Sequence, residues 1–132
     1  MSGEIPDIEI VSLVVCDEIR KEDNGKGILI GVYIDDILVR EFPAALALSL
    51  WLHLRISSAA EFPFEFRFTE TNGTHASEVG GMAKIKQKGA AVITTPPVPI
   101  ILGGEGDLKI ESKFGDGEWE PLRNLKVGLM KA

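Results

Sequence analysis

The chain has 132 residues, of which 45% are hydrophobic, and this predicts a single globular domain over residues 1–132. A net charge of −6 disfavours contact with a phosphate backbone, so we expect no nucleic-acid partner. The chain starts without a basic leader, and its longest apolar run, residues 44–54, is far shorter than the roughly 20 residues that span a bilayer, so we expect a cytoplasmic protein with no membrane partner.

The first part of the chain predicts a long strand, a hairpin turn and a return strand. The long strand covers about residues 8–20, and its middle is apolar on both faces, as in a strand covered from two sides. An Asn-Gly pair within residues 22–27 provides the positive φ angles of a tight turn, and residues 28–34 form the return strand. Asp35-Asp36 ends that strand, and residues 37–39 continue it or form a short strand of their own.

The segment over residues 44–56 alternates strictly. Leucine or isoleucine occupies every even position from 46 to 56, and the odd positions end in Trp51, His53 and Arg55. This period of two predicts a strand with one buried face. Alanine and leucine favour helices by intrinsic propensity, so a helix that starts at Pro43 is the alternative.

Phenylalanine occupies alternate positions of the next predicted strand, at residues 62, 64, 66 and 68, which places four rings on one face. An Asn-Gly pair at residues 72–73 marks a hairpin turn. Turns rich in glycine or proline then separate further short strands over residues 76–86, 91–94, 100–102, 108–114, 119–122 and 125–130. Turns at intervals of about 8–12 residues are typical of an all-β protein.

These elements predict an all-β fold, a two-layer antiparallel, immunoglobulin-like β-sandwich of about seven to nine strands. The predicted core contains the phenylalanine row, the leucine row, Val14, Ile30 and Val32. The two rows are assigned to the core by alternation, which shows which residues of a strand share a face.

The residues that could carry chemistry form no recognisable catalytic, metal or cofactor site. Cys16, the single cysteine, shares a strand face with Val14, which predicts a buried side chain and not a nucleophile. His53 and His75, the two histidines, lie in no metal-binding motif. The glycines of residues 103–106 precede a strand pattern instead of a helix, so we interpret them as a turn and not as a phosphate loop. We therefore expect no enzyme activity, no cofactor and no metal.

Trp51, His53 and Arg55 are the candidate interaction residues. They lie on the strand face opposite the leucine row and follow three small residues, so they are expected to form a partly apolar shelf. Tryptophan and arginine are enriched at binding hot spots. The alternative is that another part of the chain covers Trp51.

The predicted function is a non-enzymatic interaction or accessory module. It would bind a protein partner, or a second copy of itself as a homodimer, through this shelf or by strand addition at a sheet edge. The alternative is a small-ligand or calcium-binding domain that uses acidic loops such as Asp35-Asp36 and Asp107. An enzyme with an unfamiliar site is a third hypothesis, and it requires a pocket with convergent polar groups.

Four stretches of the N-terminal third stand out as a set: Val-Cys-Asp-Glu-Ile-Arg-Lys-Glu at 15–22, Asn-Gly-Lys at 24–26, Ile-Leu-Ile-Gly-Val-Tyr at 28–33 and Phe-Pro-Ala at 42–44. Together they resemble an uncharacterised bacterial family of small β-sandwich proteins, a domain of unknown function. The similarity covers most of the chain and is closer in the N-terminal half. It implies the fold, and it brings no activity, cofactor or site residue.

Overall fold

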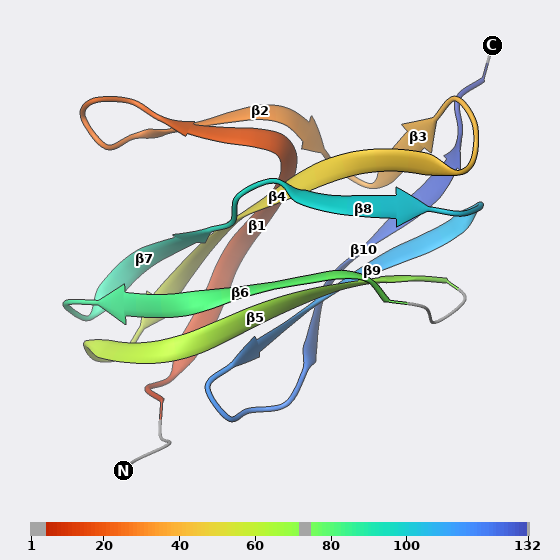
Figure 1. The fold of residues 1–132 in the computed structure, drawn as a ribbon. Helices are drawn as coiled ribbons and strands as arrows, with labels where there is room; N and C mark the ends of the chain where they lie inside the picture. The colour runs from red at the N-terminus through yellow and green to blue at the C-terminus, as the bar shows by residue number, and fades with distance from the viewer. Residues whose placement is uncertain (1–4, 72–74, 132) are drawn as a thin grey trace.

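The computed structural model describes residues 5–71 and 75–131, with the backbone alone at residues 75 and 76. The predicted turn at residues 72–73 lies outside this range. The described residues form ten strands and contain no helix that could cross a bilayer (Figure 1). The strands are β1 (Ile8–Lys21), β2 (Gly27–Tyr33), β3 (Asp36–Val39), β4 (Ala44–Ile56), β5 (Ala60–Glu70), β6 (His75–Ile85), β7 (Gly89–Thr94), β8 (Val98–Leu102), β9 (Gly106–Phe114) and β10 (Glu120–Leu129). The predicted all-β class is confirmed.

The ten strands form two sheets of five strands each. The first sheet has the order β2-β1-β4-β7. The fifth strand, β8, also pairs with β4: β7 pairs with residues 51–56 of β4, and β8 pairs with residues 44–48. The second sheet has the order β3-β10-β9-β5-β6 and curls into a half-barrel (Figure 1). Among the described strands every pair is antiparallel except β3 with β10, which is parallel. The prediction of purely antiparallel layers is therefore wrong for this one pair.

β4 is the central strand of the first sheet, because it pairs with β1, β7 and β8. Its leucines at positions 48, 50, 52 and 54 are completely buried. The alternative of a helix is wrong, since a helix would distribute these side chains around its surface whereas a strand turns them all to one face. Burying each of them contributes about 1.5–3 kcal/mol, far more than the few tenths of a kcal/mol that separate residue propensities.

The core lies between the leucine face of β4 and the phenylalanine face of β5. Phe62, Phe66 and Phe68 are buried as predicted, and Phe64 is half-buried and packs on the same cluster. Strands β8, β9 and β10 complete this core with Val98, Ile100, Leu102, Leu108, Ile110, Leu125 and Val127. One hydrophobic cluster therefore joins the two sheets.

β1 bends midway and changes its partner. Residues 8–16 pair with β4, whereas residues 15–21 pair with β2. Beyond Cys16 the strand has left β4, so residues 17–33 form a two-stranded ribbon that projects from the first sheet, at the upper left of Figure 1. We call this ribbon the β1–β2 arm.

The β1–β2 arm overturns part of the predicted core. Ile30 and Val32 of β2 are 39% and 47% exposed, although the sequence predicts them as core residues. Val14 is half-buried and pairs with Trp51, on the face opposite the leucine row. The bend in β1 explains Ile30 and Val32, because it carries β2 away from the second sheet. Val14 precedes the bend and faces outward by strand alternation, since Leu13 and Val15 face the core.

Candidate interaction surface

The three predicted interaction residues follow one another on the outer face of the first sheet. In the register of the sheet, Val14 of β1 is the neighbour of Trp51, and Val92 of β7 is the neighbour of His53. Arg55 lies one further position along the same row of β4. Its neighbour in the register is Glu9 of β1, so the surface is apolar around Trp51 and carries one charge of each sign at Arg55 and Glu9.

The three side chains differ in their exposure. Trp51 and His53 are half-buried, whereas Arg55 is exposed. The ring centroids of Trp51 and His53 are 6.0 Å apart and the ring planes are tilted, which is within the range of favourable aromatic contacts. The row thus offers a partner an aromatic pair and, beside it, the neighbouring charges of Arg55 and Glu9.

The β1–β2 arm turns the expected flat shelf into a pocket. The arm face that carries Ile19 and Lys21 lies beside the indole of Trp51 and encloses a space of about 310 Å³. This Trp51 pocket is lined by Ile19, Lys21, Gly25, Gly27, Trp51, Val92 and Thr94. The arm covers one side of Trp51, as the alternative interpretation expected, and leaves an apolar hollow with one lysine at its wall.

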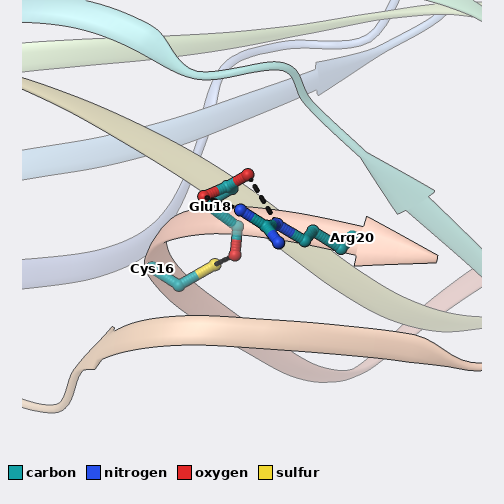
Figure 2. A network of polar contacts seen from close by, with 3 residues as sticks. All are labelled: Cys16, Glu18 and Arg20. Carbon is teal, nitrogen blue, oxygen red and sulfur yellow. Dashed lines mark hydrogen bonds and ion pairs between the residues drawn. The ribbon is translucent and has the colours of Figure 1, made fainter. Parts of the chain in front are cut away.

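The opposite face of the arm is polar where β1 contributes to it. Figure 2 shows Arg20 donating from its Nε to the Glu18 carboxylate at 2.9 Å, so these two exposed charges are paired within one strand. Cys16 lies at the bend, completely buried, with its Sγ 3.6 Å from the carbonyl oxygen of Glu18 (Figure 2). Burial raises the pKa of the Cys16 thiol, which keeps it protonated and a poor nucleophile at neutral pH. Its predicted burial is confirmed.

Tyr33 ties the end of β2 back to β1. Its hydroxyl donates to the Asp17 carboxylate at 2.8 Å. Burial, together with this hydrogen bond and the negative charge of Asp17, raises the pKa of Tyr33 to about 12. The phenol is therefore neutral at every physiological pH and acts as a hydrogen-bond donor that fixes the base of the arm.

Trp119, which the sequence does not single out, forms a cluster on the outer face of the second sheet. The guanidinium of Arg67 lies 4.1 Å from the centroid of this indole, and its Nη2 is 2.9 Å from Glu111 Oε1. The alternation of Arg67 with the phenylalanines indicates an outward side chain, but no sequence pattern places Trp119 beside it. Since a cation of the protein itself already lies on this indole, Trp119 is a weaker candidate for partner binding than Trp51.

Two of the acidic residues proposed for calcium flank a lysine in the second sheet. In the backbone register, Lys126 of β10 is the neighbour of Asp36 of β3 on one side and of Asp107 of β9 on the other. A positive charge on the strand between these two aspartates disfavours a metal ion there. Within residues 5–71 and 75–131, no group of three or more metal-ligating side chains is assembled. The side chain of His75 lies outside the described residues.

The glycine-rich segment before β9 is a turn, as predicted. It joins β8 to β9, so a strand and not a helix N-terminus follows it. The backbone N–H of Gly103 donates to the Glu70 carboxylate at 2.8 Å, and Glu105 and Asp107 add further negative charge. This end of the molecule therefore repels phosphate.

No protein-family model matches the chain, and no curated protein matches it significantly. The resemblance to an uncharacterised bacterial family therefore stays a prediction.

Proposed function

We propose that this protein is a non-catalytic, cytoplasmic interaction module that binds a protein partner through the Trp51 pocket. The observation that carries the proposal is the position of Trp51, which is half-buried on an outer sheet face and forms the wall of a hollow instead of packing into the core. Binding hot spots are typically such aromatic anchors beside a water-excluding pocket. His53 and Arg55 extend the contact along β4.

The chemistry of the pocket defines the kind of partner. Ile19, Trp51 and Val92 favour an apolar anchor side chain, and Lys21 favours an acidic residue next to that anchor. The pocket lies between the arm and the outer face of the first sheet, where a loop or an extended segment of the partner could enter. We therefore propose a partner segment in which an aromatic or aliphatic residue adjoins a carboxylate.

A photo-crosslinking amino acid at Val92 tests this proposal in the cells that produce the protein. Val92 lines the pocket and is 48% exposed, so its crosslinks report what occupies the pocket. We expect a discrete adduct that Trp51→Ser abolishes while the far-ultraviolet circular dichroism of the variant is unchanged. The matched control is the same crosslinker at Ile101, which is exposed on β8 and outside the pocket. Identical adducts at the two positions, or an adduct at Val92 that persists in Trp51→Ser, contradict the proposal.

A small anionic, partly apolar ligand is the second candidate. The volume of about 310 Å³ lies at the lower end of the range for small-molecule sites, and Lys21 provides a cation for a carboxylate or sulfonate. Titration with 8-anilinonaphthalene-1-sulfonate discriminates the two: saturable fluorescence that Trp51→Ser removes supports a ligand site. The calcium version is less favoured, because Lys126 is the strand neighbour of both Asp36 and Asp107.

The immunoglobulin-like outline also belongs to the proposal. Two sheets that share one hydrophobic core support it. The ten strands, the parallel β3–β10 pair and the strong curl of the second sheet are departures from a simple sandwich. A search for other folds with this strand order would test whether the outline is shared.

A further inference from the structure

β2 is an edge strand without the usual protection. Within the described part of the chain, β1 is the single strand that pairs with β2, so the other edge of β2 presents unpaired backbone groups. The strand reads Gly-Ile-Leu-Ile-Gly-Val-Tyr and contains neither a charged residue nor a proline. Such an edge is a template for another strand, and natural proteins normally block it.

The other described edge strands carry recognised blocking features. β3 has four residues, too few to offer a long template. β7 runs into Pro96-Pro97, whose nitrogens cannot donate hydrogen bonds. β6 carries the exposed charges of Glu78 and Lys84. β8 contains Pro99, whereas β7 has neither charge nor proline within its own bounds. β2 combines seven uncharged residues without proline, and its one irregular residue is Gly31, whose φ is +71°.

An apolar row follows the same edge. Ile28, Ile30 and Val32 lie on the arm face opposite the Trp51 pocket, and each is about 40% exposed or more. Ile34, directly after the strand, is 68% exposed. Four β-branched side chains in a row are unusual on an exposed face, and a strand paired with the edge of β2 would place its own side chains directly beside this row.

We propose that β2 pairs with β2 of a second copy of this chain, antiparallel and around a two-fold axis at Ile30. The pairing joins two arms into a four-stranded ribbon in the order β1-β2-β2-β1. The inference concerns the edge of β2 and does not depend on the proposed role of the Trp51 pocket.

The sequence of β2 is complementary to itself in this register. On the exposed face, Ile30 lies opposite Ile30 of the partner subunit, and Ile28 lies opposite Val32 of the partner subunit. On the other face, Leu29 meets Gly31 of the partner subunit, so a large side chain faces a residue that has none. Tyr33 meets Gly27 of the partner subunit in the same way. Cross-strand pairs of this kind are the units that stabilise a sheet.

The register is also constrained by parity and charge. A shift by one residue would place the apolar row of one copy on the opposite face from that of the other, so it is disfavoured. In the register centred on Ile30, Lys26 lies opposite Ile34 of the partner subunit and adjacent to Asp35 of the partner subunit. At each end of the paired strands, a lysine of one copy thus lies next to an aspartate of the other.

The arm itself benefits from the pairing. A two-stranded ribbon is marginally stable in water, whereas three or more strands with an apolar face are stable. The arm has two strands, and one of its faces lies beside Trp51 and lines the pocket there. One strand pair buries less than the roughly 1,600 Å² of a standard interface, so we expect a weak dimer that forms as the concentration rises.

Sedimentation equilibrium over a concentration series tests the dimer. We expect wild-type protein to dimerise and Ile30→Lys to weaken the dimer by a factor of at least ten, because two like charges would meet at the axis. The control is Ile101→Lys on β8, where the isoleucine is 61% exposed against 39% for Ile30, and it is expected to leave the dissociation constant unchanged. A wild-type protein that stays monomeric over the whole series, or a dimer that Ile30→Lys leaves intact, overturns the proposal.

A charge exchange tests the register and guards against misfolding. Ile28→Lys and Val32→Glu are each expected to weaken the dimer, whereas the double variant places a lysine opposite a glutamate at both symmetric positions and is expected to recover most of the affinity. No recovery in a folded double variant overturns the register. Crosslinking from Val92 in Ile30→Lys separates this inference from the proposed function, since a persistent Val92 adduct with a lost dimer attributes each effect to its own surface.

Discussion

The two strands of the β1–β2 arm leave the body of the protein together but have opposite edge chemistry. Residues 17–21 of β1 read Asp-Glu-Ile-Arg-Lys, whereas β2 contains no charged residue. Glu18 and Arg20 pair with each other, so the charged strand is satisfied within one chain. A charged edge discourages strand addition and an uncharged edge permits it. The difference indicates that the arm has one protected edge and one edge available for a partner.

The largest expected effect is on the free energy of unfolding when a core side chain is truncated, and it distinguishes the core from the exposed apolar row of β2. Phe66→Ala creates a cavity among completely buried side chains and is expected to reduce the free energy of unfolding by about 3–5 kcal/mol. Ile30→Ala removes an exposed side chain and is expected to cost less than about 1 kcal/mol in the monomer. Urea unfolding at low protein concentration measures both. Equal losses would show that the β2 row is part of the core.

Gly31 is expected to be the next most sensitive position of the arm. Its φ angle is +71°, and a Cβ atom at this position would overlap the Asp17 carboxylate. Gly31→Ala is therefore expected to destabilise the protein by about 1–3 kcal/mol through backbone strain and steric overlap. The matched control is Gly104→Ala, where a Cβ atom meets no atom within 4 Å. Equal and small effects at the two glycines would mean that the arm does not hold this geometry.

These two predictions concern one part of the fold that the sequence predicts and one part that it does not. The period of two in the leucine and phenylalanine rows defines faces that are buried in every arrangement of the strands, so the core of β4 and β5 is predictable. The same alternation in β2 identifies Ile28, Ile30 and Val32 as one face, but it does not tell whether a second sheet covers that face. That depends on the bend at Cys16, where β1 changes partner, which is a long-range property.

The candidate site shows the same division. Parity correctly assigns Trp51, His53 and Arg55 to the outer face of the first sheet. The pocket beside Trp51 is not predictable, because it forms between that face and an arm whose direction the sequence does not determine. The cluster of Trp119 with Arg67 is equally out of reach, since it depends on contact between β5 and a residue far along the chain.

A moderate effect is expected at the ion pair on the second sheet. Arg67 and Glu111 are mostly buried and Arg67 lies on the indole of Trp119, so Arg67→Ala is expected to cost about 1–2 kcal/mol in urea unfolding. Arg20→Ala breaks the exposed, solvent-screened pair with Glu18 on the arm and is expected to have a much smaller effect than Arg67→Ala. A larger loss at Arg20 than at Arg67 would contradict the assignment of the arm as the solvent-exposed region.

The smallest expected effect is a titration at the base of the arm. Tyr33 is the single tyrosine, so the rise in absorbance at 295 nm reports it alone. We expect a native pKa of about 12, and a decrease toward the ordinary value of 10.0 in Asp17→Asn. Because the folded state retains the proton longer than the unfolded state, this contribution to stability is present below pH 10.0 and is lost as the pH rises through about 12. Titration of wild type and Asp17→Asn at the same pH would show that the hydroxyl does not bond to Asp17.

The most direct test of strand addition at β2 is amide hydrogen exchange measured at low and at high protein concentration. If β2 pairs with a second copy, its outward amide groups become hydrogen-bonded as the dimer forms, and their exchange slows with concentration while exchange in β6 and β7 stays constant. Exchange in β2 that is fast and independent of concentration would contradict the proposal that this edge binds a second copy of the chain.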